Sequence, residues 1–358
     1  MKTKRELFLS ISLIFLLSIL TAGCGISSIN RPAAGKGWSD ERITVGFSQV
    51  GSESDWRMAS TASVKEAFST VSGYNLVYND AQQKQSNQIK AIRQFIDQDV
   101  DYILLDPITE HGWDTALQEA KDASIPVIVF DRKVELTDDS LYTAWIGSDF
   151  YLEGKRAVEW LRRFLNTKGY LGDVNIVNIQ GTLDSTAQIG RSRALEEAVA
   201  GNPKWHILDR QSGDFTEARG REVMEDMLLR FSDRINVVYC ENDNEAYGAI
   251  EALESAGRKI GCDIAAGEVL VLSFDATRKG LEFTQRGLIA VNTECSPLYG
   301  PLLTELIGKL ERGEALDKET YISEGQFSTQ DEVPGIKADG DYYPVTILTK
   351  DIMDNRKY

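Results

Sequence analysis

The regular alternation of short apolar runs with helix-like segments, which begins near residue 42, constrains the fold more than any other feature of this sequence. Strands that alternate with helices form right-handed βαβ units, and these units place their strands side by side in a parallel sheet. The first series predicts strands at residues 44–49, 75–78, 102–105, 127–130 and 142–146, and helices at 61–72, 85–98, 113–123 and 151–166.

A second series of the same kind follows directly. It predicts strands at residues 174–179, 206–211, 236–241 and 269–274, with helices at 186–201, 216–230 and 244–256 between them. A chain of 358 residues is long enough for two such units. The sequence therefore predicts an α/β fold with two Rossmann-like lobes built on parallel sheets, although the pattern alone would also fit two separate enzymes.

The first residues have the features of a bacterial lipoprotein signal. Three basic residues precede an apolar stretch at 7–20, and a small-residue cleavage site ends in Cys24. We expect residues 1–23 to be removed and Cys24 to carry a lipid that anchors the protein, outside the cytoplasm, to the bacterial cell membrane. The alternative is a plain signal peptide with a chance cysteine, because Thr21 stands where a lipobox usually has leucine.

Composition then limits the partners of the mature chain. Residues 24–40 are rich in small residues and predict a flexible tether. Removing the signal leaves 36 basic against 54 acidic side chains, a formal charge of about −18, which repels nucleic acid. Because no later apolar run approaches the roughly 20 residues of a transmembrane helix, we expect the remainder to be soluble.

Residues for catalysis, metal binding or cofactor binding are sparse. The two histidines, His111 and His206, lie far from any nucleophile in the sequence, and the cysteine spacing fits no metal motif. Cys240, Cys262 and Cys295 are expected to be buried small residues, with Cys240–Cys262 the most reasonable bridge. Neither glycine-rich phosphate motif is present, so no cofactor and no metal are predicted.

The loop after the first strand concentrates groups that suit a sugar. It carries Glu53, Ser54, Trp56 and Arg57 beyond the carboxyl end of the strand, where open α/β sheets bind ligands. An indole face stacks on the apolar face of a sugar ring, and the polar groups pair with its hydroxyls. The alternative is that Trp56 is a core residue and Arg57 a solvated helix charge.

Polar residues recur directly after later strands, namely Asp131, Arg132, Asn242 and Asp275. The arginine offers a planar fork of donors, the two aspartates accept from hydroxyls, and the asparagine can do both. Asp106 and Asp243 also follow strands, but we interpret them as turn or helix-capping residues.

Six segments resemble the galactofuranose-binding proteins of bacterial ABC importers, which belong to the ribose-type, pentose and hexose branch of the periplasmic binding proteins. They are GFSQVGSESDWR (46–57), DAQQKQSNQIKAI (80–92), FDRK (130–133), QSGDF (211–215), END (241–243) and SFDATRKG (273–280). The resemblance runs from about residue 42 to at least residue 310. It implies a type I periplasmic binding protein fold, with a three-crossover hinge between two lobes and a sugar in the cleft.

The resemblance also implies where the lobes divide. Its first lobe comprises residues 41–147 and 276–292, its second lobe comprises residues 148–275 and 293–330, and residues 331–358 form a tail packing on the hinge. The three crossings are expected near 147–148, near Asp275 and near 292–293.

Ligand contacts carry over residue by residue. They are Glu53, Ser54, Trp56, Arg57, Asp131, Arg132, Arg191, Asn242 and Asp275. Arg191 matches the arginine that this family uses on the sugar, and Asn292 is a further candidate at the hinge. Asp55 departs from the pattern, because a small residue would intrude less; it is expected to cap the helix or to alter ligand preference.

These features favour a monomeric binding protein that captures a monosaccharide, with galactofuranose preferred over other aldopentoses and aldohexoses, and delivers it to an ABC permease. A binding protein that presents sugar to a membrane receptor or histidine kinase is the alternative. A glycosidase using two of Glu53, Asp131 and Asp275 is disfavoured, since the neighbouring arginines would keep these carboxylates ionised. The effector domain of a LacI-type repressor is disfavoured because the exported N-terminus lacks a helix-turn-helix.

Overall fold

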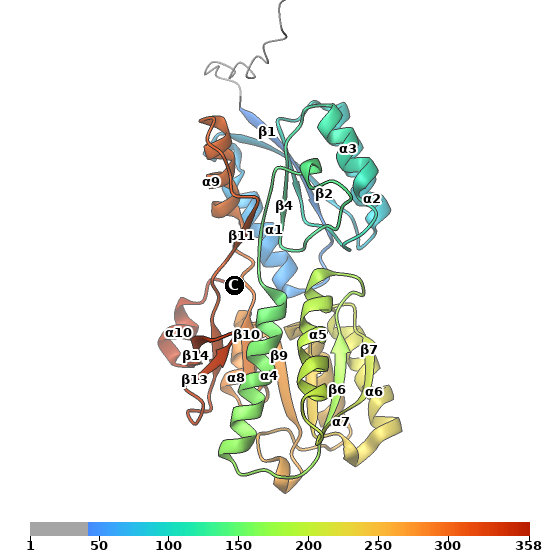
Figure 1. The fold of residues 1–358 in the computed structure, drawn as a ribbon, viewed down its shortest axis with the longest axis vertical. Coiled ribbons are helices and arrows are strands. Elements are labelled where there is room, and N and C mark those ends of the chain that lie inside the picture. The colour runs from blue at the N-terminus through green and yellow to red at the C-terminus, as the bar shows by residue number, and fades with distance from the viewer. Residues whose placement is uncertain (1–41) are drawn as a thin grey trace, which may run out of the picture. The chain divides into compact units, whose positions relative to one another are not determined.

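The computed structural model describes residues 42–358, so the predicted signal peptide, the predicted lipid attachment at Cys24 and the predicted tether lie outside the described residues. Within this range the chain forms two large sheets and one hairpin (Figure 1). We call each large sheet, together with the helices that cover it, a lobe. None of the helices described here has the length and apolar character required to cross a bilayer.

The first lobe is built on a six-stranded sheet of order β11-β5-β4-β3-β1-β2, in which all neighbouring strands are parallel. Its strands are β1 (Ile43–Gln49), β2 (Tyr74–Asp80), β3 (Tyr102–Leu105), β4 (Val127–Phe130), β5 (Ala144–Gly147) and β11 (Glu319–Tyr321). Its helices are α1 (Asp55–Ala67), α2 (Gln85–Asp97), α3 (Asp114–Asp122) and α9 (Gly300–Glu311). Because alternate strand residues face opposite sides, α1 and α9 bury one face and α2 and α3 the other.

The second lobe is built on a seven-stranded sheet of order β15-β12-β10-β9-β8-β6-β7, in which only the β10–β12 pair is antiparallel. Its strands are β6 (Val174–Gln180), β7 (Trp205–Ser212), β8 (Val237–Cys240), β9 (Leu270–Asp275), β10 (Val291–Glu294), β12 (Gln326–Ser328) and β15 (Thr346–Ile347). Its helices are α4 (Phe150–Thr167), α5 (Thr186–Ala200), α6 (Glu217–Phe231), α7 (Asp243–Ser255), α8 (Arg278–Gln285) and α10 (Lys350–Asn355). Helices α4 and α5 cover one face, and α6 and α7 cover the other.

The smaller elements complete the chain. The hairpin of β13 (Gly335–Ala338) and β14 (Asp341–Pro344) packs against α4. Short 3₁₀ turns occur at Thr70–Ser72, Asp139–Leu141, Ser232–Arg234 and Ile264–Ala266. The nine strands and seven helices predicted from the alternation are all present, with shifted ends. The largest shift is in α1, because Ser54 caps this helix and starts it at Asp55.

The chain passes between the two sheets after β5, between β10 and α9, and between β11 and β12. The predicted boundaries are wrong for residues 276–292, which lie in the second lobe because β9, α8 and β10 form one parallel βαβ unit. They are also wrong for much of 293–330, since α9 contacts α1 and β11 pairs with β5 in the first lobe. The crossing predicted near Asp275 is therefore absent, and the later two fall at 294–300 and 321–326.

The C-terminal residues contact the second and third crossings between the lobes, and the carboxylate of Glu294 joins them. Glu294, at the end of β10, accepts hydrogen bonds from Arg356 (2.6 Å) and from the Tyr358 hydroxyl (2.8 Å). Its second oxygen accepts from the Gly325 backbone N–H at 2.6 Å. The segment 331–358 otherwise packs on the second lobe, through the hairpin, β15 and α10.

The suggested Cys240–Cys262 disulfide is not formed, and both residues are free thiols, as is Cys295. Cys240 belongs to the buried cluster under α6 and α7, whereas Cys262 packs against the cluster on the opposite face of the same sheet. The sheet therefore separates the two sulfurs.

Candidate ligand-binding site

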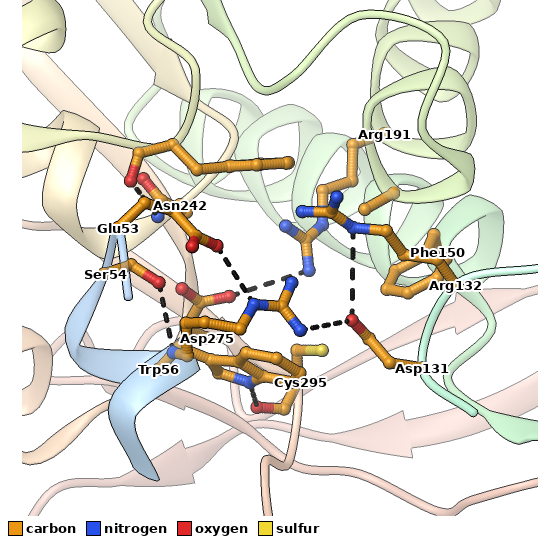
Figure 2. A pocket seen from close by; sticks show the side chains of 13 residues that line it. Glu53, Ser54, Trp56, Asp131, Arg132, Phe150, Arg191, Asn242, Asp275 and Cys295 are labelled. Carbon is orange, nitrogen blue, oxygen red and sulfur yellow. Dashed lines mark hydrogen bonds and ion pairs between the residues drawn. The ribbon is translucent and has the colours of Figure 1, made fainter. Parts of the chain in front are cut away.

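A pocket lies where the carboxyl ends of the strands of the two lobes meet. The space that no atom occupies, with the solvent at its open mouth included, is about 290 Å³. All nine predicted ligand residues line it, and Figure 2 shows their side chains converging from both lobes. Four further residues complete the wall, namely Phe150, Ala187, Phe215 and Cys295. Asn292 and Asp55 are not part of the wall.

The sheet topology explains this convergence. In each lobe the strand order reverses direction beside one central strand, β1 in the first lobe and β6 in the second. The loops after the strands on either side of such a point diverge and leave a crevice. Glu53 to Arg57 follow β1 and Asp131 follows β4, while Asn242 follows β8 and Asp275 ends β9. The two crevices face each other across the pocket.

Trp56 is a buried core residue and also lines the pocket, so it has both of the roles that the sequence offered as alternatives. Its side chain is only 4% exposed and its ring meets the edge of Tyr299, with centroids 6.3 Å apart. The indole N–H donates to the Cys295 backbone carbonyl at 2.7 Å. Ser54 caps α1 by accepting from the Arg57 N–H at 3.1 Å. The ring is therefore held in one orientation.

Arg57 is not the solvated charge that the alternative interpretation proposed. Its guanidinium is buried, donates to Glu53 (3.0 Å) and Asp131 (3.2 Å), and pairs with Asp106. It also lies over the Trp56 ring, 4.6 Å from the centroid. Asp106 is thus a buried ion-pair partner, and its interpretation as a turn residue was incomplete. Arg57 chiefly organises the floor of the pocket.

Asp243 likewise has a structural role, although it is not a cap. Asn242 caps α7 by accepting from the Glu245 N–H at 2.8 Å. Asp243 accepts from Ser273 (2.7 Å), from the Thr277 backbone and side chain (2.8 Å each), and from Asn292 (2.6 Å). These contacts hold the turn that follows Asp275, a residue with a left-handed φ of 93°.

Arg132 is the least paired cation of the pocket. It is buried, and its one hydrogen bond to the residues described is the donation from NH1 to the Ile108 carbonyl at 3.0 Å. The nearest carboxylate, Asp131, is 4.0 Å away. Burial, together with the charge of Arg57, lowers the pKa of Arg132, while Asp131 opposes the shift. Its remaining N–H groups are therefore available to a ligand.

Arg191 and Asp275 form the opposite wall. Arg191 donates to Glu153 at 2.8 Å and lies 3.7 Å from an oxygen of Asp275. Burial raises the pKa of Asp275, and the charge of Arg191 opposes this rise. Three arginines and three carboxylates thus line the pocket, so its formal charge is balanced and suits an uncharged, hydroxyl-rich ligand.

One cluster near this wall has the spacing of a metal site. Ligand atoms of Glu153, Cys295 and Glu324 lie within 4.8 Å of one another. Arg191 pairs with Glu153, and Arg156 donates to the Glu324 carbonyl at 3.0 Å. Two adjoining guanidinium groups disfavour a bound cation, and we assign no metal here.

Comparison with known proteins agrees with this architecture. The family model described as a periplasmic binding protein domain matches residues 45–296. The galactofuranose-binding protein of Escherichia coli (strain K12) is 43% identical over 229 residues, which cover 63% of this chain and 70% of that protein. This chain belongs to the periplasmic binding protein family. It is a binding protein and not an enzyme, as the sequence predicted.

Two solved structures of similar proteins contain furanose sugars. A protein from Mycobacterium smegmatis in complex with β-D-fucofuranose is 40% identical, with a TM-score of 0.75, and the match covers 80% of this chain and 91% of that chain. The arabinose-transporter binding protein from Shewanella sp. ANA-3, bound to α- and β-L-arabinofuranose, is 37% identical with a TM-score of 0.74, covering 81% and 93%. The predicted two-lobe type I fold is confirmed.

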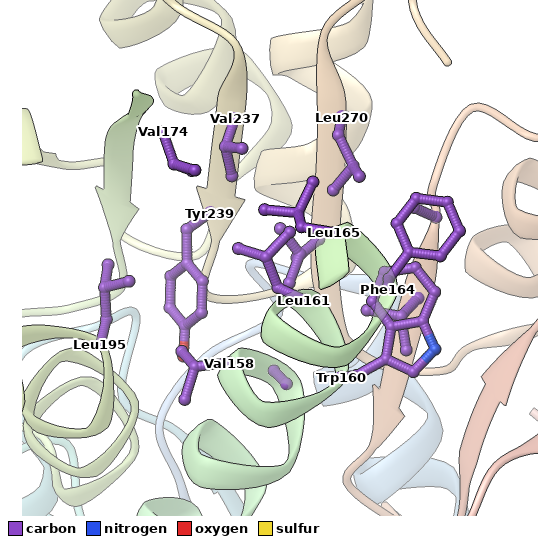
Figure 3. Packing of buried hydrophobic residues seen from close by; sticks show 14 of the residues in the cluster. Val158, Trp160, Leu161, Phe164, Leu165, Val174, Leu195, Val237, Tyr239 and Leu270 are labelled. Carbon is purple, nitrogen blue, oxygen red and sulfur yellow. The ribbon is translucent and has the colours of Figure 1, made fainter. Parts of the chain in front are cut away.

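In this periplasmic binding protein, helix α4 supports the pocket from the second lobe. It starts at Phe150, and its later residues Trp160, Leu161 and Phe164 belong to the buried cluster on this face of the sheet, where α4 packs against β10 and the β13–β14 hairpin (Figure 3). Burying three large apolar side chains contributes several kcal/mol, at about 1.5–3 kcal/mol each. The wall that carries Phe150 and Glu153 is therefore rigidly mounted.

Phe150, Ala187, Phe215 and Cys295 were missed because apolar side chains after a strand resemble core residues. Phe150, Ala187 and Phe215 join the buried cluster that contains Trp56, which spans both lobes. Only the placement of Phe215 in the QSGDF segment could have suggested a pocket residue.

Gly181 leaves room for the Phe215 ring. A Cβ at this position would lie 1.9 Å from the ring, so Gly181→Ala must displace this wall. We expect a loss of stability of about 1–3 kcal/mol, as for other overpacked cores. Gly201→Ala, at a glycine with an ordinary φ of −81° and no neighbour closer than 3.4 Å to the added Cβ, is the control for the substitution itself. Urea unfolding of the two variants compares them; equal losses would contradict the steric account.

Glu241, directly after β8, is a buried carboxylate without a side-chain cation partner among the residues described. It accepts from Ser192 (2.6 Å), Asn178 (3.2 Å) and the Gly181 N–H (2.9 Å). Burial, which these hydrogen bonds oppose, raises the pKa of Glu241 to about 7. The unfolded chain titrates near 4.3, so the folded state binds this proton more tightly.

This shift predicts a pH dependence of stability. The contribution of Glu241 is fully present below about pH 4.3 and is lost as the pH rises through about 7. The free energy of unfolding of the wild type, relative to Glu241→Gln, should therefore fall between about pH 5 and about pH 8. Urea titrations of both proteins at the two pH values measure this difference; a constant difference would contradict the shift.

Proposed function

We propose that this periplasmic binding protein captures a neutral monosaccharide in the furanose form, with galactofuranose preferred, and releases it unaltered. One observation carries the proposal most directly: donors and acceptors from both lobes surround a single small, charge-balanced pocket. The wall combines buried aromatic side chains with a few convergent polar groups, as small-molecule sites typically do.

The individual groups support a polyol ligand. Arg132 has N–H groups to donate, and one oxygen of Glu53 is buried without a hydrogen-bond partner among residues 42–358. A buried polar atom without a partner is destabilising by about 1–3 kcal/mol, and a ligand hydroxyl would supply the missing partner. Similar proteins with furanose sugars bound add weight to the ring form.

We infer further that the protein is an exported lipoprotein, anchored through Cys24, that delivers its sugar as a monomer to an ABC permease. The similarity to binding proteins of ABC import systems supports this role. Cys24→Ser should release the protein from the membrane fraction. A neighbouring gene for a histidine kinase, with no permease gene, would instead favour the sensor.

Calorimetry of the soluble domain from residue 25 tests the ligand. The panel comprises methyl β-D-galactofuranoside, L-arabinose, D-galactose and D-galacturonate. We expect at least one neutral sugar to bind and to raise the melting temperature by mass action, and the charged uronate to bind more weakly because the pocket holds no excess cation. A panel without any binding would refute a sugar ligand of this class.

A further inference from the structure

The two lobes contact each other directly near the pocket through three hydrogen bonds, and the donor of each is a backbone N–H. The Asp55 N–H donates to the Asn244 side-chain oxygen at 3.1 Å, and the Lys133 N–H donates to the Thr186 hydroxyl at 3.0 Å. The Glu110 N–H donates to the Asp184 carbonyl at 2.9 Å. Each donor belongs to the first lobe and each acceptor to the second.

The Asp55 contact completes a helix terminus with a residue from the other lobe. The first N–H groups of a helix have no partner within the helix. Ser54 accepts from Arg57 at the start of α1, so the N–H of Asp55 needs another acceptor. Asn244, in the first turn of α7 and 6% exposed, provides it.

The Lys133 contact involves a helix terminus of the second lobe. Thr186 is the first residue of α5, and its hydroxyl accepts from the backbone immediately after Arg132. Both contacts therefore adjoin pocket residues, Trp56 in one case and Arg132 in the other, yet neither Asn244 nor Thr186 lines the pocket.

We propose that Asn244 and Thr186 form a latch, in which they hold the two lobes together and slow the release of ligand. The proposal rests on the proposed function, because a latch matters for a ligand that is enclosed between the lobes. Contacts that exist in only one of two conformations shift the equilibrium toward that conformation. These bonds join different lobes, so any hinge opening that separates the lobes breaks them.

The expected size of the effect follows from ordinary hydrogen bonds. In the open form water replaces each lost partner, so one bond favours closure by about 2- to 10-fold. The ligand enters the open form, and closure of the lobes then retains it. The latch, which stabilises the closed form, therefore lowers the dissociation rate and leaves the association rate nearly unchanged. The two sites lie at the starts of different helices, α7 and α5, and should act independently.

Stopped-flow kinetics with methyl β-D-galactofuranoside test the latch. Asn244→Ala and Thr186→Val should each raise the dissociation rate about 2- to 10-fold, and the double variant should multiply the two effects. The association rate should stay within about twofold of wild type. Thr186→Ser keeps the hydroxyl acceptor and is the matched control, with a dissociation rate near that of wild type. Dissociation rates of Asn244→Ala and Thr186→Val equal to wild type would overturn the proposal.

A second measurement separates the latch from the choice of sugar. If no furanoside binds the wild type, the proposed function fails, and small-angle scattering of the ligand-free proteins then decides the latch. A larger radius of gyration in the Asn244→Ala, Thr186→Val double variant than in Thr186→Ser supports the latch. Equal radii in that case overturn it.

Discussion

Replacing Arg132 with methionine is expected to weaken the binding of a furanose sugar by at least about 100-fold while leaving the fold intact. Hydrogen bonds to charged groups contribute about 1.5–3 kcal/mol each, and the loss of two of them corresponds to this factor. Arg132 can make two hydrogen bonds to a ligand because, within the described part of the protein, only one of its N–H groups has an acceptor, the Ile108 carbonyl.

Stability should change little, because the buried guanidinium has its nearest carboxylate at 4.0 Å and gains little from the fold. Methionine fills a similar linear space beside Phe215, whose ring centroid is 5.2 Å from the Arg132 guanidinium carbon. Calorimetry measures the affinity and thermal unfolding the stability. An affinity within threefold of wild type would show that Arg132 does not contact the ligand.

Replacing Arg57 with methionine is expected to destabilise the protein by about 3–5 kcal/mol, the range found when one partner of a buried ion pair is removed. The substitution leaves the carboxylates of Glu53, Asp106 and Asp131 close together without their shared cation. Asp106 is fully buried, and burial already raises its pKa against the opposing charge of Arg57.

The loss should shrink at low pH. A carboxyl with a raised pKa in the folded state adds stability at low pH that disappears as the pH rises through that pKa. Without Arg57 the pKa of Asp106 rises further, so urea unfolding near pH 5 should show a smaller defect than near pH 8. Arg93→Met removes the exposed pair with Glu119 and is the control, with an expected loss below about 1 kcal/mol. A similar loss in both variants would contradict the assigned role of Arg57.

The alternation of apolar runs was sufficient to predict the strands of both sheets up to β9, because buried parallel strands are short, continuous and apolar. The alternation did not predict β10 and β11, the strands between which the chain crosses back to the first lobe. β10 spans only Val291–Glu294, with three of its four residues polar, and β11 spans Glu319–Tyr321 at an exposed edge. Neither strand has a periodicity of its own, and only pairing with β9 or β5 reveals them.

The site was predictable where polar residues follow strands, since topology alone brings such positions together. The sequence could not reveal which charges pair with one another. Arg57 and Arg132 look equivalent in the sequence, yet Arg57 is surrounded by three carboxylates and Arg132 is not. That difference depends on Asp106, which reaches Arg57 from β3, 49 residues away.

A crystal structure of the protein from residue 25 onward, grown with methyl β-D-galactofuranoside, tests the central claim most directly. We predict one sugar between the lobes, with ring oxygens or hydroxyls within about 3 Å of the Arg132 guanidinium and of the Asp275 carboxylate. A sugar bound outside the pocket, or one that contacts a single lobe, would contradict the account.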